Sequence, residues 1–202
     1  MEELKKRYES KFNSQKSVVK TNEFWNRYYK KGERFFYNRM IYCLGFLYGR
    51  VLDVGSADGF GAHLMTKNLN IKSIICLEIQ DRAIKKAKRN LTPYKNIFIK
   101  KGIAEQIPFP DNSFDSVHCG ATLEHVFDDK KAISEIARVT KDLVVMAIPI
   151  GGGTSVEHVR QYKTPESFKE RITPFFIIIE ERIFKRDNNR KSMAFICRKK
   201  NV

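Results

Sequence analysis

Short apolar runs alternate with helix-like segments between residues 50 and 149, and this alternation restricts the fold more than any other feature of the sequence. The apolar runs have the length of buried strands, and most of them are followed by a segment with helical periodicity. Strand–helix repetition at this spacing predicts a doubly wound, mostly parallel α/β sheet. The predicted strands are 50–54, 73–78, 96–100, 114–119 and 143–149, and the predicted helices are 61–69, 81–90 and 128–139.

The two ends of the chain depart from this alternation. Residues 175–184 and 192–198 are β-rich runs separated by a charged segment, which predicts an antiparallel hairpin at the end of the sheet. Residues 1–20 are charged and lack periodicity, whereas aromatic residues recur at helical spacing from Thr21 onward. We therefore expect a charged N-terminal segment and then one domain, 21–202. In that domain a helical cap (21–48) precedes the sheet core (49–202).

The net charge of +15 raises the question of a nucleic-acid partner. The excess is +7 in residues 1–50 and +6 in residues 151–202, but only +2 in residues 51–150. Because the lysines form no dense patch with interleaved aromatics, we favour a solvated lysine-rich surface. A basic rim that attracts anionic ligands to a substrate site stays open as the alternative.

Cysteine spacing and hydropathy indicate the class of protein. The four cysteines are scattered and form neither a CxxC pair nor a disulfide framework, so we expect reduced, mostly buried thiols in a cytoplasmic protein and no metal site. No run of eighteen apolar residues occurs, and the first residues lack the apolar core of a secretory signal, so we expect no membrane span. The cysteines are Cys43, Cys76, Cys119 and Cys197.

A glycine-containing turn, Asp53–Gly61, follows the first predicted strand. In doubly wound sheets the ligand lies beyond the carboxyl ends of the strands, at the switch point beside this strand. Gly55 and Gly59 permit a tight turn and a close approach of backbone to ligand, although packing alone also explains such glycines. Glu78 ends the second predicted strand, where a carboxylate can accept hydrogen bonds from both ribose hydroxyls. Asp53 lies within an apolar run and needs a partner there. Together these residues predict a site for a nucleotide-like cofactor.

Several segments in this order resemble the class I S-adenosylmethionine-dependent methyltransferases, particularly the type 11 methyltransferase domain. The segments are VLDVGSADGFG (51–61), CLEIQD (76–81), AEQIPFPDNSFD (104–115), LEHV (123–126) and IARV (136–139). The resemblance runs from about Phe24 to the C-terminus. It implies a Rossmann-like, seven-stranded fold and S-adenosyl-L-methionine as the cofactor.

The resemblance also implies which residues contact the cofactor. Asp53 would support the amino group of the methionine part, Glu78 would hold the ribose, and Ile79 would pack on the adenine. Cys119 would line the face from which the methyl group leaves. Ile103 stands where many relatives have an Asp that reads the adenine, which leaves that contact to backbone or Glu105. The full implied set is Asp53, Gly55, Ser56, Ala57, Gly59, Glu78, Ile79, Ala104, Glu105 and Cys119.

The reaction of this family is an in-line displacement on the sulfonium methyl group, so the protein positions the reactants and, where needed, removes a proton. His158 and His125 are the candidate general bases, because a neutral imidazole accepts protons near pH 7. Arg160 and Tyr162 either contact an anionic or polar substrate or pin their loop to the following helix. His118 lies in an apolar strand and is expected in the core.

The leading hypothesis is methyl transfer to an oxygen, nitrogen or carbon of a small molecule such as a sugar, a lipid or another metabolite. The alternative within enzymes is RNA or protein methylation, which the net charge motivates. Residues 119–122 lack the Asn/Asp-Pro-Pro-Tyr motif of amino-group nucleic-acid methyltransferases, so we do not favour a nucleic-acid substrate. A catalytically silent, cofactor-binding partner subunit is the alternative outside enzymes, motivated by Ile103 and by the absence of an unambiguous base.

Overall fold

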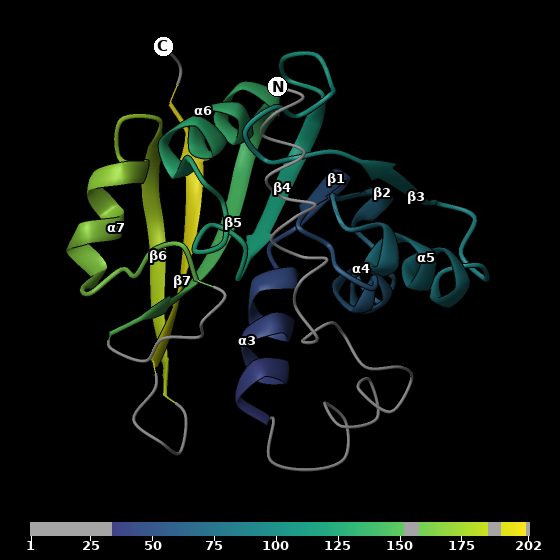
Figure 1. The fold of residues 1–202 in the computed structure, drawn as a ribbon, viewed down its shortest axis with the longest axis horizontal. Coiled ribbons are helices and arrows are strands. Elements are labelled where there is room, and N and C mark those ends of the chain that lie inside the picture. Colours follow the sequence, from purple (N-terminus) through teal and green to yellow (C-terminus); the bar gives the residue numbers. More distant parts are fainter. Residues whose placement is uncertain (1–33, 152–157, 186–190, 201–202) are drawn as a thin grey trace.

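A computed structural model describes residues 34–151, 158–185 and 191–200 (Figure 1). The predicted charged segment 1–20 and the first part of the predicted helical cap, 21–33, lie outside the described residues. The division of the chain into segment, cap and core therefore stays a prediction, apart from the helix at the end of the cap.

One mixed sheet of seven strands forms the centre of the molecule, in the order β3-β2-β1-β4-β5-β7-β6 (Figure 1). Neighbouring strands from β3 to β5 pair in parallel, whereas β7 pairs antiparallel with both β5 and β6. The chain order reverses direction between β1 and β4, which makes this the switch point of the sheet. The predicted doubly wound sheet with a terminal antiparallel hairpin is confirmed. The strands are β1 Gly49–Val54, β2 Ile71–Glu78, β3 Ile97–Lys101, β4 Phe114–Gly120, β5 Thr140–Ile150, β6 Phe176–Lys185 and β7 Lys191–Lys199.

Helices cover both faces of the sheet. Successive strand residues point to opposite faces, and Val51 and Leu52 of β1 accordingly belong to two different apolar clusters. The cluster of Val51 takes in residues of α3, α4 and α5, and the cluster of Leu52 takes in residues of α6 and α7. The helices are α3 Arg34–Leu44, α4 Phe60–Met65, α5 Asp81–Asn90, α6 Asp129–Val139 and α7 Pro165–Ile172.

Two helices differ from expectation. The helix predicted over 61–69 ends at Met65, because Asn68 turns the chain and donates from its side chain to the carbonyls of Leu44 and Leu47. Helix α7 was not predicted from the sequence, although its start carries a recognisable signal. Thr164 and Ser167 form a capping box around Pro165 at the first helical position.

All four cysteines are buried and free, as predicted from their spacing. Among the described residues, no helix combines the length and the apolar character that a membrane crossing needs.

Arg138 of α6 holds the irregular segment that connects β3 to β4. Its guanidinium donates to the carbonyls of Ile107 and Phe109 and to the carboxylates of Asp111 and Glu135, at 2.7–2.9 Å. Glu135 in turn accepts from the backbone N–H of Ile107 at 2.9 Å. The hydrogen bonds from Arg138 and the backbone N–H of Ile107 outweigh the opposing effect of burial and lower the pKa of Glu135.

We expect Arg138→Ala to lower the free energy of unfolding by about 2 kcal/mol at pH 7, because several hydrogen bonds to charged groups are lost. The folded-state pKa of Glu135 lies below its ordinary value of 4.5, so its contribution is present above that pH and is lost as pH falls below it. Urea unfolding from pH 7 to pH 3 should therefore show the wild type and the variant converging on the acid side. Arg89→Ala, an exposed substitution on α5, is the control and should show no such gap. A constant gap across this pH range would contradict the assigned role of Glu135.

Candidate functional site

The turn between β1 and α4 holds an unusual concentration of left-handed backbone. Gly55, Ala57 and Gly59 have φ values of +72°, +50° and +86°. The backbone N–H groups of Gly55 and Ser56 donate to the carbonyl of Leu77, at 2.8 and 3.2 Å, which ties the turn to the end of β2. The turn is thereby fixed at the carboxyl ends of β1 and β2, beside the switch point.

Packing alone already requires both glycines. A Cβ on Gly55 would lie 2.3 Å from Thr122 Oγ1, and a Cβ on Gly59 would lie 2.5 Å from Leu91 Cδ1. Both positions also have the positive φ that glycine tolerates best. The packing explanation that the sequence left open therefore holds, and the glycines alone do not establish a ligand site.

Glu78 links the glycine turn to the loop after β2. Its Oε2 accepts from the N–H of Ala57 at 2.8 Å, and its Oε1 accepts from the N–H groups of Ile79 and Gln80 at 2.8 and 2.9 Å. The residue is only 6% exposed, and burial raises the pKa of its carboxyl while the three N–H groups oppose that effect. The carboxylate thus orders two loops at the place where the sequence predicts a ribose, and ribose binding stays a prediction.

Asp53 has a buried partner, as its apolar surroundings require. Its Oδ1 lies 2.7 Å from His118 Nδ1, and both side chains are almost fully buried. His118 is in the core, as predicted. The predicted contact of Asp53 with the cofactor's amino group therefore competes with a structural contact inside the sheet.

Two further predicted cofactor residues point elsewhere in the structure. The Cys119 side chain is fully buried in the apolar cluster of α6 and α7, so only its backbone is free to border a cofactor. The carboxylate of Glu105 accepts from the N–H groups of Phe127 and Asp128, at 3.0 and 3.3 Å, and so joins its loop to the start of α6. Ala104 and Ile103 are buried beside it. Side-chain roles of Cys119 and Glu105 toward the cofactor are thus disfavoured.

Glu124, His125 and His158 come together beyond the carboxyl ends of β4 and β5. The rings of His125 and His158 meet edge to face with centroids 4.9 Å apart, and His125 Nε2 lies 3.9 Å from Glu124 Oε1. The two imidazoles predicted as bases are therefore neighbours. Glu124 was not among the predicted site residues, although it stands beside His125 in the LEHV segment.

Glu124 is the most deeply buried member of this cluster, with 2% of the residue exposed. Burial raises the pKa of its carboxyl to about 7, against the opposing effects of its own backbone N–H and of the positive Arg39. Its carbonyl oxygen accepts from the N–H groups of Val159 and Arg160, at 2.9 and 3.3 Å. The segments that follow β4 and β5 are thus joined at this residue.

The side chains of Arg160 and Tyr162 are engaged inside the protein. Arg160 donates to the carbonyls of Leu123, Val126 and Phe127 at 2.7–3.1 Å. The hydroxyl of the buried Tyr162 donates to the carboxylate of Asp129 at 2.9 Å. These contacts favour loop pinning over the predicted substrate contact for both residues.

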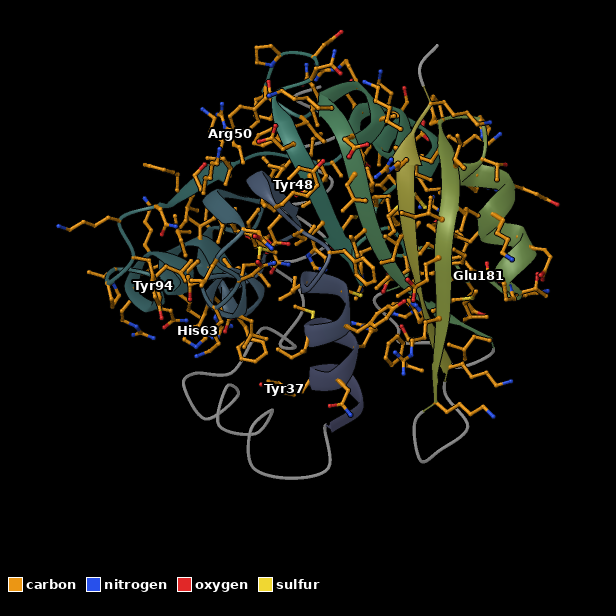
Figure 2. All side chains as sticks on the ribbon, turned by 180° about the vertical axis from the view of Figure 1, so that it is seen from behind. Tyr37, Tyr48, Arg50, His63, Tyr94 and Glu181 are labelled. Atoms are coloured by element: carbon orange, nitrogen blue, oxygen red, sulfur yellow. The ribbon has the colours of Figure 1, made fainter. Side chains whose placement is uncertain are left out.

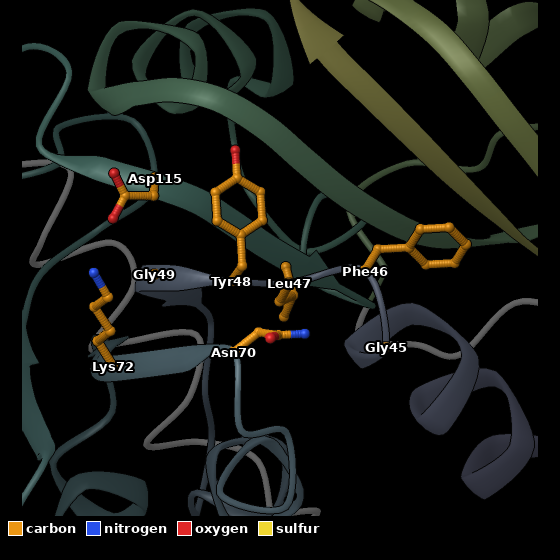
Figure 3. Close-up of a pocket in the computed structure, with 8 residues that line it drawn as sticks. All are labelled: Gly45, Phe46, Leu47, Tyr48, Gly49, Asn70, Lys72 and Asp115. Carbon is orange, nitrogen blue, oxygen red and sulfur yellow. The ribbon is translucent and has the colours of Figure 1, made fainter.

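A hollow of about 580 Å³ lies at the amino-terminal ends of the parallel strands, opposite the glycine turn (Figure 3). It is lined by residues 45–49, at the beginning of β1, together with Asn70, Lys72 and Asp115. Asp115 is occupied there, since it accepts from the N–H of Arg50 at 2.8 Å and pairs with Lys141 at 3.1 Å. Because ligands of doubly wound sheets bind at the carboxyl ends of the strands, this hollow is not the cofactor site.

Comparisons with known proteins find methyltransferases. Residues 52–148, just under half of the chain, match the family model described as a methyltransferase domain. The uncharacterized methyltransferase YcgJ of Bacillus subtilis is 32% identical over 94 residues, which cover 46% of this chain and 36% of that protein. The ubiquinone/menaquinone biosynthesis C-methyltransferase UbiE of Rickettsia massiliae is 32% identical over 104 residues, which cover 48% of this chain and 42% of that protein. The matches thus span less than half of either relative.

Solved structures share the fold over more of the chain. The crystal structure of YcgJ from Bacillus subtilis has a TM-score of 0.68 at 16% identity, and the match covers 84% of this chain and 100% of that one. The [4+2]-cyclase SpnF has a TM-score of 0.69 at 17% identity, with 80% of each chain covered. At such identities the structures support the fold alone, and the methyltransferase assignment rests on the sequence matches. The matches support a class I S-adenosylmethionine-dependent methyltransferase, whose methyltransferase domain is matched by residues 52–148 of this chain.

Proposed function

We propose that this chain binds S-adenosyl-L-methionine between the glycine turn and Glu78 and transfers its methyl group to a small-molecule acceptor. One observation carries the proposal: the Glu78 carboxylate and the left-handed turn are joined at the switch point, through the N–H of Ala57. A carboxylate at this place can exchange backbone partners for two ribose hydroxyls. Ser56 adds a buried hydroxyl that, apart from a contact with the sulfur of Cys76, a weak partner, has no hydrogen-bond partner among the described residues.

The remaining predicted contacts are proposed with roles that fit the geometry. The glycine turn, with Gly55, Ser56, Ala57 and Gly59, would surround the methionine part of the cofactor through its backbone. Ile79 would pack on the adenine, while Ala104 and Cys119 would border the site through backbone atoms. When bound, the cofactor supplies an electrophilic methyl group, so the chain has to orient the acceptor and exclude water.

His125 and His158 are proposed as the residues that prepare the acceptor. They lie beyond the end of β4, and an acceptor hydroxyl or amine has to lose a proton during transfer. An imidazole nitrogen is suited to accept that proton near pH 7. For a carbon acceptor the same two rings would help to orient the substrate.

The names of relatives support a small-molecule acceptor. UbiE is named for ubiquinone and menaquinone biosynthesis, and a protein of Oryza sativa that is 30% identical over 92 residues is named a 2-methyl-6-phytyl-1,4-hydroquinone methyltransferase. The latter match covers only 26% of that protein. A hydroquinone is therefore used to test this chain and is not assigned as its substrate.

The proposed function is tested with S-adenosylmethionine labelled in its methyl group. The protein is incubated with a short-chain 1,4-hydroquinone, a metabolite extract, total RNA and a protein mixture, in separate reactions. We expect label in the low-molecular-weight fractions and none in RNA or protein. Label confined to RNA or protein would contradict the acceptor class, and cofactor binding without any transfer would favour a silent partner subunit.

Glu78→Ala should weaken the binding of S-adenosylhomocysteine about 10- to 100-fold, because hydrogen bonds to a charged group contribute about 1.5–3 kcal/mol. Calorimetry measures the affinity, and circular dichroism confirms that the variant is folded. Asp81→Ala is a matched control, since this neighbouring carboxylate is exposed and pairs with Lys101 at the surface. Equal affinity of wild type and Glu78→Ala would remove Glu78 from the site.

A further inference from the structure

We propose that Glu124, His125 and His158 form a binding site for a divalent transition-metal ion, with zinc as the best-fitting occupant. The donor atoms of the three side chains all lie within 4.8 Å of one another. No metal site was expected from the sequence, because its cysteines form no CxxC pair and because these ligands come from two separate loops. Ion binding itself does not depend on methyl transfer, whereas its effect on an acceptor rests on the proposed function.

The chemistry of the donors selects the class of ion. Two imidazole nitrogens and one carboxylate oxygen form a set that Zn²⁺ accepts in open, catalytic-type sites. The same set also suits Fe²⁺ or Co²⁺, whereas Mg²⁺ and Ca²⁺ prefer oxygen ligands alone. We therefore expect zinc to bind this cluster far more tightly than magnesium.

The burial of Glu124 is the second observation that points to a cation. Its Oε2 is buried and has no hydrogen-bond partner among the described residues. A buried carboxylate without full compensation is costly, and a bound cation would supply that compensation. Arg39 of α3 acts on Glu124 through its charge, but its Nη1 donates to Ser192 Oγ at 2.6 Å. The positive charge of Arg39 is therefore shared between Glu124 and Ser192.

The geometry requires a small closing movement and leaves one position open. Ligand atoms around a tetrahedral zinc ion lie roughly 3.3 Å apart, given metal–ligand distances of about 2.0–2.1 Å. The separations here are larger, with 3.9 Å between His125 Nε2 and Glu124 Oε1. The His125 side chain is 25% exposed and His158 is half-buried, so neither ring is enclosed in the core, and the proposal requires both to move toward the carboxylate.

The backbone that carries the ligands is already held together. The carbonyl of Glu124 accepts from Val159 and Arg160, the two residues that follow His158. The Arg160 guanidinium in turn binds the carbonyls of Leu123 and Val126, on either side of the Glu124–His125 pair. An ion would therefore connect two loops whose relative position is set without it.

Three protein ligands would leave a fourth position for water or for an oxygen or nitrogen atom of the acceptor. A coordinated hydroxyl has a lowered pKa and releases its proton more readily. Imidazole nitrogens that bind the ion are not available as bases, so the ion would replace them in preparing the acceptor. This difference separates the metal role from the role proposed for the free imidazoles.

The sequence allows a direct test, because two of its four histidines belong to the proposed site and the other two lie outside it. His125 and His158 belong to the proposed site, whereas His118 contacts Asp53 in the core and His63 contacts Tyr94 beside α4 and α5 (Figure 2). Metal-free, full-length protein is titrated with Zn²⁺ while the imidazole signals are followed by NMR. We expect the signals of His125 and His158 to change together at one equivalent of zinc, with His63 and His118 unchanged.

Variants make the test specific. Glu124→Gln keeps the shape of the side chain and removes its charge, and His158→Ala removes a ligand at a half-buried position. Each should weaken zinc binding in calorimetry at least tenfold, and His63→Ala should not. No change at His125 and His158, or equal weakening by His63→Ala, would overturn the metal site.

Binding of S-adenosylhomocysteine to the same samples keeps the two proposals separate. Zinc binding without the cofactor product would leave the metal site standing and overturn the cofactor site. Binding of the cofactor product with no binding of zinc would leave the cofactor site standing and overturn the metal site.

Discussion

Replacing Gly55 with valine should severely weaken the binding of S-adenosylhomocysteine. The backbone φ of +72° disfavours any β-branched side chain, and strain of this kind costs about 1–3 kcal/mol. The new Cβ would also lie 2.3 Å from Thr122 Oγ1 and 2.6 Å from Thr122 Cγ2. Thr122 would have to give up its hydrogen bond to the carbonyl of Val54, at 3.1 Å. We expect the turn to shift away from β4, which would separate it from the ribose site at Glu78.

Calorimetry and urea unfolding together test this prediction. We expect affinity to fall about 100-fold or more, which corresponds to about 2.7 kcal/mol, and stability to fall as well. Gly45→Ala is the control, because its added Cβ would approach no atom more closely than 3.5 Å and should leave both properties unchanged. A folded Gly55→Val protein with wild-type affinity would show that the turn does not contribute to the cofactor site.

The sheet was predictable from the sequence because its signals are local. Each strand of a parallel sheet is a continuous apolar run, and each helix has a polar face, so β2 and α5 were recognised nearly to the residue. The end of α4 was not, since it depends on Asn68 bonding to the carbonyls of Leu44 and Leu47, more than twenty residues away. The alternation alone also does not determine which strands are neighbours, and the order β3-β2-β1-β4-β5-β7-β6 emerges only from pairing.

The site was less predictable, because the partners of its residues are distant in the chain. The sequence shows that Asp53 needs a partner, but it does not identify His118, which is 65 residues away. The sequence leaves open whether Arg160 contacts a substrate or pins its loop, and its hydrogen bonds to three carbonyls of another loop favour pinning. The importance of Glu124 depends on its burial and on the approach of His158, and neither property can be recognised in the LEHV segment.

Asp53→Ala should lower the free energy of unfolding by about 3 kcal/mol, because it leaves a buried polar group without its partner. Asp53 Oδ1 lies 2.7 Å from His118 Nδ1, and the other ring nitrogen of His118 has no partner among the described residues. Because a carboxylate oxygen only accepts hydrogen bonds, this contact requires the hydrogen on Nδ1 of the imidazole. Urea unfolding measures the loss. The exposed Asp81→Ala is the control and should cost less than about 1 kcal/mol. If Asp53→Ala has an equally small effect, Asp53 has no structural role.

Asp53→Asn then separates structure from cofactor binding. An amide oxygen can still accept the hydrogen bond from His118, so stability should fall by only about 1 kcal/mol. The negative charge, however, is gone, and the positive amino group of the cofactor would lose an electrostatic partner. If Asp53 supports that amino group, the affinity for S-adenosylhomocysteine should fall about tenfold in a protein that is still stable. Unchanged affinity would assign Asp53 to the sheet alone, and would leave Glu78 as the acidic residue that binds the cofactor.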